Sequence, residues 1–215
     1  MKIGINGLGR IGRLVLRAAL GGIPRDSKDQ NADARLEIMH LNEVSGGANT
    51  TSHLLEFDSV HGRWRADIEP AESSITVDGR RMSFSSSEEP GSVDWGAHGC
   101  ELVLECTGRF RTPEKLAGYF SKGVQKVMVA APVQDGQVLN LVYGINDHLY
   151  DPIRHHIITA ASCTTNSLAP LVNVVHEGIG ILHGQITTIH DPTNTNLIVD
   201  ALHKDLSWAR SAMTS

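Results

Sequence analysis

Cys163 and His190 are the residues of this sequence best suited to covalent chemistry. Cys163 lies in the run Ala-Ser-Cys-Thr-Thr-Asn, residues 161–166, where an expected strand ends and an expected helix begins. At a helix N-terminus the dipole and the backbone N–H groups stabilise a thiolate, so Cys163 is a candidate nucleophile. His190 ends an expected strand over 185–189, twenty-seven positions later, where an imidazole can act as a general base. From residue types alone, a buried, inert Cys163 and an unrelated His190 are an equally consistent interpretation.

A glycine turn near the N-terminus points to a different chemistry, the binding of a dinucleotide. Residues 7–12 read Gly-Leu-Gly-Arg-Ile-Gly; they follow an apolar strand over 2–6 and precede apolar residues at helical spacing. The first glycine permits a tight turn, the second lets the backbone approach a pyrophosphate, and the third lets the helix pack on the strand. With 21 glycines in the chain the spacing alone is weak, and a plain strand-to-helix turn is the alternative.

An acidic residue after the second strand would complete such a site. Glu43 follows the expected strand over 36–41 and is placed to accept hydrogen bonds from the adenosine ribose. It lies 31 residues after Gly12, where about 20 is usual. A polar loop over 25–34 accounts for the difference. A carboxylate there disfavours a 2′-phosphate and favours NAD over NADP, whereas a solvated loop acid is the alternative interpretation.

Strands and helices alternate from residue 2 onward, which predicts an α/β fold with a doubly wound parallel sheet. The region 66–85 is expected to form an antiparallel excursion on that sheet. One helix is predicted to begin at Pro113, with Thr112 as its N-cap, and another to run over 163–176 behind Ser162. Its Pro170 should cost a backbone hydrogen bond or bend it. Further strands are expected at 74–77, 82–85, 101–105, 126–130, 139–143, 157–161 and 185–189.

Composition excludes several classes of protein. The formal net charge is −5, and no run of Lys or Arg provides a nucleic-acid or anionic-membrane footprint. No segment approaches the roughly 20 apolar residues of a membrane helix. The three cysteines cannot all pair with one another and lack the spacing of a zinc site, so we expect no metal and a reducing, cytoplasmic setting.

Five segments together resemble the phosphorylating glyceraldehyde-3-phosphate dehydrogenase family. The resemblance runs over nearly all of residues 2–215 and is most specific at the active-site block 161–166. The segments, in chain order, are Ile-Asn-Gly-Leu-Gly-Arg-Ile-Gly-Arg at 5–13, Asp-Ser-Val-His-Gly at 58–62, Cys-Thr-Gly-Arg-Phe at 106–110, Ala-Ser-Cys-Thr-Thr-Asn at 161–166 and Thr-Thr-Ile-His at 187–190.

The resemblance implies an NAD-binding Rossmann domain over 1–162 and, over 163–215, the incomplete start of an α+β catalytic domain. It makes Cys163 the nucleophile that attacks the aldehyde carbon and His190 the base, and inorganic phosphate then attacks the thioester. Residues near the phosphates of the substrate would be Ser162, Thr164, Thr193 and Arg210. The cofactor would contact Gly7, Gly9, Arg10, Ile11, Gly12, Glu43, Thr107, Gly108 and Phe110.

Departures from the family pattern concern both length and subtype. Family members are typically homotetramers and continue well beyond Ser215, so we read the chain as a fragment or truncated product of the family. An inactive dinucleotide-binding module is the alternative function, and a cysteine hydrolase is a weaker one because it leaves the glycine turn unexplained. Glu43, Cys106 and Ala130 stand where Asp, Ser and Ser are usual. These changes resemble the dehydrogenases associated with arsenic resistance, in which arsenate would replace phosphate as the acyl acceptor.

Overall fold

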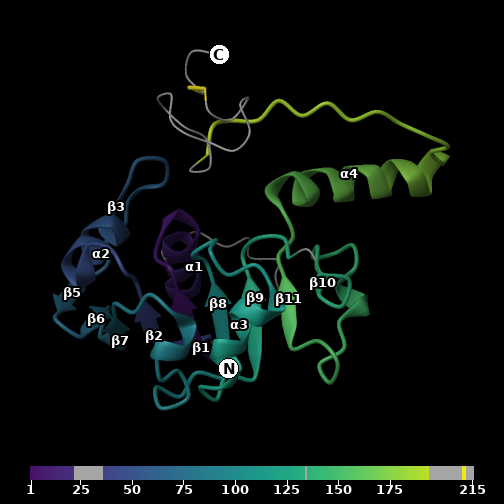
Figure 1. Ribbon diagram of the computed structural model, residues 1–215. Coiled ribbons are helices and arrows are strands. Elements are labelled where there is room, and N and C mark those ends of the chain that lie inside the picture. The colour runs from purple at the N-terminus through teal and green to yellow at the C-terminus, as the bar shows by residue number, and fades with distance from the viewer. Residues whose placement is uncertain (22–35, 134, 194–209, 212–215) are drawn as a thin grey trace. The chain divides into compact units, whose positions relative to one another are not determined.

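A computed structural model describes residues 1–21, 36–133, 135–193 and 210–211 (Figure 1). They fall into two compact units, Met1–Val174 and Val175–Ser215. The elements, in chain order, are β1 Lys2–Asn6, α1 Arg10–Leu20, β2 Glu37–Asn42, α2 Gly47–Glu56, β3 Phe57–Asp58, β4 Gly62–Arg63, β5 Ile68–Ala71, β6 Ser74–Val77, β7 Arg80–Ser85, the 3-10 turn η1 Pro90–Ser92, β8 Leu102–Glu105, α3 Pro113–Phe120, β9 Lys126–Val129, β10 Leu139–Asn140, the 3-10 turn η2 Asp147–Leu149, β11 Ile157–Thr159 and α4 Cys163–Ile179.

The first unit is built on one sheet of nine strands in the order β10-β11-β9-β8-β1-β2-β7-β6-β5. The strands from β10 to β7 run parallel, and β6 and β5 continue the sheet in antiparallel fashion. This arrangement confirms the predicted doubly wound sheet and the antiparallel excursion. The register aligns the last residue of β1, Asn6, with Asn42 at the end of β2 and Glu105 at the end of β8.

Two hydrophobic clusters cover the two faces of the sheet. Leu102 and Val103 are neighbours in β8, and their side chains belong to different clusters, as alternation along a strand requires. The Leu102 cluster contains Leu16 of α1 and Leu55 of α2, whereas the Val103 cluster contains residues of α3. Helices therefore cover both faces and hold the carboxyl ends of the central strands in place.

Most predicted elements are confirmed, and the helix over 163–179 continues through Pro170. The strand predicted over 185–189 is wrong: this stretch is irregular and exposed, and no strand in the described residues pairs with it. A lone strand leaves its N–H and C=O groups without ladder partners, which explains the outcome. The strand predicted over 139–143 is reduced to Leu139–Asn140, and the polar loop over 25–34 lies outside the described residues.

Candidate functional site

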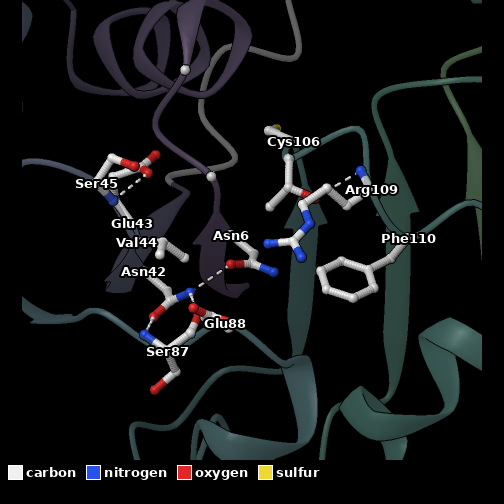
Figure 2. Close-up of a pocket in the computed structure, with 13 residues that line it drawn as sticks. Asn6, Asn42, Glu43, Val44, Ser45, Ser87, Glu88, Cys106, Arg109 and Phe110 are labelled. Atoms are coloured by element: carbon white, nitrogen blue, oxygen red, sulfur yellow. Dashed lines mark hydrogen bonds between the residues drawn. The ribbon is translucent and has the colours of Figure 1, made fainter. Parts of the chain in front are cut away.

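A cavity of about 250 Å³ lies at the carboxyl ends of the central strands (Figure 2). The chain leaves β1 toward β2 on one side, and β8 pairs with β1 on the other side. Such a reversal of strand order is where open α/β sheets bind ligands. The lining consists of Asn6, Gly7, Gly9, Asn42, Glu43, Val44, Ser45, Ser87, Glu88, Cys106, Thr107, Arg109 and Phe110.

The three glycines of the turn differ in what surrounds them. Gly7 has φ +88°, and a Cβ there would lie 2.7 Å from the backbone nitrogen of Thr107. A Cβ on Gly12 would lie 2.0 Å from the carbonyl oxygen of Gly7, so only glycine permits this approach of α1 to the turn. A Cβ on Gly9 would have no neighbouring atom within 4 Å, and this glycine lines the cavity. Contacts within the protein thus leave Gly9 unexplained, while a ligand against the backbone would explain it.

Glu43 lies at the cavity beside the glycine turn. Its carboxylate accepts a hydrogen bond from the backbone N–H of Leu8 at 2.6 Å and another from the N–H of Ser45 at 3.0 Å. A carboxylate has about four lone-pair positions, so two remain for a ligand. The side chain of Glu43, directly after β2, is half-buried and lines the cavity.

The floor of the cavity is a polar network that sequence reasoning missed. The side-chain oxygen of Asn6 accepts a hydrogen bond from Asn42 at 2.8 Å, and Asn42 also donates to the carbonyl of Ser87 at 2.8 Å. The oxygen of Asn42 accepts from the Ser87 N–H and the Ser85 hydroxyl. Dashed lines in Figure 2 mark two of these hydrogen bonds, the one from Asn42 to Asn6 and the one from the Ser87 N–H to Asn42. A polar residue as the last member of an apolar strand was the available signal.

Glu105 continues this network under the turn that follows β8. It is 1% exposed, and its carboxyl is hydrogen-bonded to the backbone N–H of Thr107 at 2.7 Å and to Asn6 at 3.0 Å. The hydroxyls of Thr107 and Tyr119 also bond to it. Burial raises the pKa of Glu105, while the hydrogen bonds from Thr107, Tyr119 and Asn6 oppose that shift.

Five of the nine predicted cofactor residues line the cavity: Gly7, Gly9, Glu43, Thr107 and Phe110. Gly12 lies behind it and serves the packing of α1. Arg10, Ile11 and Gly108 are not among the lining residues. The cradle made by Gly7 and Gly12, the open space at Gly9 and the N-terminus of α1 fit the pyrophosphate of a dinucleotide. Contact of each residue with NAD stays a prediction.

The predicted nucleophile lies in a turn with unusual backbone geometry. Cys163 is exposed and is the first residue of α4. Ala161, two residues earlier, has φ +55°, a conformation that non-glycine residues rarely adopt. Ser162 caps the helix as predicted, because its hydroxyl accepts the N–H of Thr165 at 3.0 Å. The amide of Asn166 ties the turn to the carbonyls of Ala160 and Ser162. Such local strain is concentrated at functional sites.

His190, Thr193 and Arg210 are described in the second unit, whereas Cys163, Ser162 and Thr164 belong to the first. His190 is exposed, and its Nδ1 lies 2.7 Å from the carbonyl oxygen of Asp191. A hydrogen bond donated there places the lone pair of the neutral ring on Nε2, the form that a general base needs. Pairing of Cys163 with His190, and the substrate contacts of Thr193 and Arg210, stay predictions.

The other two cysteines have environments that suppress reactivity. Burial raises the pKa of Cys100 to about 11. Burial and the neighbouring Glu105 carboxyl raise the pKa of Cys106 to about 12. A thiol with so high a pKa forms little thiolate at neutral pH.

Within the described part of the chain, no helix has the length and apolar character needed to cross a bilayer.

The fold and the site define a dinucleotide-binding protein of the doubly wound α/β class. Residues 1–113, more than half of the chain, match the model of the glyceraldehyde 3-phosphate dehydrogenase NAD-binding domain, and residues 162–215 match that of the C-terminal domain. The chain belongs to the glyceraldehyde 3-phosphate dehydrogenase family.

Relatives in the family are similar along the whole chain. A glyceraldehyde-3-phosphate dehydrogenase 3 of Nostoc is 54% identical over 215 residues, which are all of this chain and 60% of that protein. The Geobacillus stearothermophilus enzyme of that name is 42% identical over the same 215 residues, again 60% of its length. The Pseudomonas aeruginosa enzyme is 40% identical, with 61% of its length covered. The chain thus spans about 60% of the length of the curated relatives it matches.

Proposed function

We propose that this protein catalyses the NAD-dependent oxidation of glyceraldehyde 3-phosphate, with transfer of the acyl group from a cysteine thioester to inorganic phosphate. The observation that carries the proposal is the exposed Cys163 at the first position of α4, on the same chain as a glycine turn built for a dinucleotide. Family membership supports both halves of it, since residues 1–113 match the NAD-binding domain model and residues 162–215 match the C-terminal domain model.

The residues of the chain have distinct tasks in this reaction. The N-terminus of α4 favours the Cys163 thiolate, which attacks the aldehyde carbon and forms a thiohemiacetal. His190 accepts the proton of its hydroxyl group through Nε2. When bound, NAD supplies the hydride acceptor that this oxidation to a thioester requires. Phosphate then attacks the thioester carbon and releases the Cys163 thiolate.

We assign the binding of the acyl acceptor and of the substrate phosphate to four polar residues. Ser162 and Thr164 flank Cys163 in the chain, and Thr193 and Arg210 supply a hydroxyl and a cation from the C-terminal segment. Arsenate has nearly the shape and charge of phosphate, so it is proposed as a second acceptor. The homotetramer typical of the family is proposed as the assembly, and three free thiols support a cytoplasmic location.

Acylation of Cys163 is the sharpest test of the activity. The purified chain is incubated with NAD and glyceraldehyde 3-phosphate, without phosphate or arsenate. We expect one acyl group on the peptide that contains Cys163, found by mass spectrometry, and an equal amount of NADH. Cys163→Ser should lose both while it keeps its affinity for NAD. Acylation of another residue, or NADH formation by Cys163→Ser, would contradict the proposal.

Glu43 gives the proposal a second test at the cofactor. Calorimetry with NAD and NADP is expected to show tighter binding of NAD, because a 2′-phosphate would meet the carboxylate that lines the cavity. Glu43→Gln should reduce the difference between the dissociation constants for NAD and NADP. Ser45→Ala, a neighbouring cavity residue without charge, serves as the control. Equal or tighter binding of NADP by the unaltered protein would overturn the role of Glu43.

An NAD-binding module without turnover is the second candidate function. It is favoured by the stretch His183–Thr193, which contains His190 and is exposed and irregular throughout. The two candidates differ in the acylation experiment. A module binds NAD and leaves Cys163 unacylated, whereas the dehydrogenase forms the acyl-enzyme.

A further inference from the structure

We propose that Glu105 is a positioning residue of the cofactor cavity. Its carboxyl fastens the turn that carries Thr107 and Phe110 to β1 and to α3, so that the floor and one wall of the cavity keep the shape that NAD binds. The inference rests on the proposed NAD-dependent function and assigns a residue to it that the sequence did not suggest.

The first argument is the set of partners that the carboxyl joins. One oxygen of Glu105 accepts the backbone N–H of Thr107 at 2.7 Å and bonds to the Thr107 hydroxyl. The other oxygen accepts from the amide of Asn6 at 3.0 Å and bonds to the hydroxyl of Tyr119. These groups come from the turn, from the end of β1 and from α3. One side chain therefore connects three elements, and two of the residues it holds, Asn6 and Thr107, line the cavity.

The second argument is burial. Glu105 is 1% exposed, and Asn6 and Tyr119 are 2% and 0% exposed. A buried carboxyl is costly to desolvate, and the rise in its pKa reflects that cost. An apolar residue could fill the same place in a buried strand. The energetic cost is consistent with a role in fixing geometry, because only a hydrogen-bonding group can hold the Thr107 turn in one orientation.

The third argument is that the side-chain N–H groups of Asn6 and Asn42 all donate to partners within the protein. Asn6 donates its two N–H groups to Glu105 and Tyr119. Asn42 donates its two to Asn6 and the Ser87 carbonyl. No amide N–H of the two asparagines is left for a ligand. The floor thus contributes shape, while the glycine turn, Glu43 and the Thr107–Phe110 turn provide the contacts.

Glu105→Gln is the informative substitution because it keeps the size of the side chain and breaks its pairing. Both carboxyl oxygens face N–H donors, one on Thr107 and one on Asn6. Either orientation of a glutamine amide would place its NH₂ group against one of those donors. The mismatch leaves a buried donor unpaired. Tyr119→Phe removes the α3 hydroxyl, which bonds to both Glu105 and Asn6. It leaves the Glu105 carboxyl paired with the N–H groups of Asn6 and Thr107, so its effect should be smaller.

The experiment compares the unaltered 215-residue chain with Glu105→Gln, Tyr119→Phe and the control Glu101→Gln. Glu101 lies just before β8 at its other end and is exposed, so the control makes the same chemical change far from the cavity. Three quantities are measured: the NAD dissociation constant by calorimetry, the thermal unfolding midpoint without NAD, and hydrogen exchange of the 106–110 segment without NAD. We expect Glu105→Gln to weaken NAD binding about tenfold and to speed exchange at 106–110. Tyr119→Phe should do both to a lesser degree, and Glu101→Gln neither.

A purely structural role predicts a different pattern. If Glu105→Gln lowers the unfolding midpoint but leaves both the NAD dissociation constant of the folded protein and the exchange at 106–110 unchanged, the inference is overturned. If Glu105→Gln does not fold, Tyr119→Phe decides by the same two readouts. Failure of the unaltered chain to bind NAD would count against the proposed function. Exchange at 106–110 would still decide whether Glu105 holds the turn.

Discussion

Two glycines of the N-terminal turn have different roles: Gly12 is needed for folding, and Gly9 is assigned to ligand binding. Gly12 is held by a contact inside the protein, since a Cβ there would lie 2.0 Å from the Gly7 carbonyl oxygen. Gly9 has an ordinary φ of −62° and open space around it. The two positions belong to one motif, but substitution at Gly12 should mainly reduce stability, whereas substitution at Gly9 should mainly weaken NAD binding.

Alanine at each position tests that distinction. Gly12→Ala is expected to destabilise the fold by about 1–3 kcal/mol, because an added methyl group overpacks a closed contact. Gly9→Ala should cost about 1 kcal/mol or less, through the poorer N-cap, and should weaken NAD binding by its new Cβ. Thermal unfolding and NAD calorimetry measure the two effects. NAD binding by Gly9→Ala as tight as that of the unaltered protein would contradict the assignment of Gly9 to ligand binding.

The three thiols differ enough for a direct test of Cys163. It is exposed at the start of α4, whereas burial raises the pKa of Cys100 to about 11 and burial with the Glu105 carboxyl raises that of Cys106 to about 12. We expect iodoacetamide at neutral pH to label Cys163 at least tenfold faster than the others, as peptide mapping would show. Cys163→Ser should abolish the fast phase. Faster labelling of Cys100 or Cys106 would contradict the prediction.

At the scale of elements, the sequence predicts what depends on local pattern. The strand over 74–77 is found at β6, and Pro113 begins α3 with Thr112 before it, although no Thr112 side-chain cap bond forms. Helix α2 is not predicted from the sequence. It begins at Gly47, directly after Gly46, both glycines have left-handed conformations, and the helix contains several Thr and Ser residues, which favour helices weakly.

The residues of the candidate site also differ in whether the local sequence pattern predicts them. Gly7, Gly9 and Glu43 could be assigned from a motif, because their chemistry follows from short spacing. The Glu105 network could not, since it exists only once the register sets Asn6 beside Asn42 and Glu105. Strand 185–189 failed for a related reason: a strand is stabilised by its neighbours, and local alternation does not show whether they are there.

A buried histidine, His40, makes the β2–β7 region sensitive to acid. His40 is 1% exposed, its two ring nitrogens lie 2.7 and 2.8 Å from the hydroxyls of Ser83 and Ser85, and it stacks on His98. Burial, and secondarily the charge of His98, lowers the pKa of His40 to about 3. Because an unfolded histidine titrates near 6.5, the unfolded state binds more protons between pH 6.5 and 3, and stability falls as the pH falls through this window.

His40→Gln should therefore reduce the pH dependence of stability. For one group the slope is at most about 1.4 kcal/mol per pH unit, and the variant should lose most of that contribution between pH 6 and 4. Urea unfolding at several pH values measures it. His53→Gln, at an exposed position on α2, is the control and should keep the slope of the unaltered protein. An unchanged slope in His40→Gln would show that His40 is not the acid-sensitive group.

At the scale of the whole molecule, the apolar surface is unevenly distributed. Among the described residues, neither core cluster includes a residue beyond Ile157. Beyond it, α4 and the stretch that follows expose large apolar side chains: Leu171, Val174 and Ile179 are 65%, 69% and 86% exposed, and Leu182 is 99% exposed. Exposed apolar side chains of this size promote association with other apolar surfaces.

A chain shortened to residues 1–162, the predicted Rossmann domain, tests this asymmetry. We expect it to fold, to bind NAD within about threefold of the 215-residue chain, and to lose most of the fluorescence of a bound hydrophobic dye. A tenfold change in affinity corresponds to about 1.4 kcal/mol, so this limit means that little binding energy comes from the removed part. Loss of folding, or dye binding equal to that of the 215-residue chain, would show that the boundary at residue 162 is misplaced.

The order of strands in the sheet also decides how copies of the protein could meet. A sheet can be extended by another chain only at its outer strands, where N–H and C=O groups lack partners. In the described sheet these are β5, which contains Glu69 and Pro70, and β10, which is two residues long. Proline offers no N–H, a carboxylate resists desolvation, and two residues give too short a template. Growth of the sheet into a fibril is disfavoured at both edges, and encounters between copies are directed to side-chain surfaces.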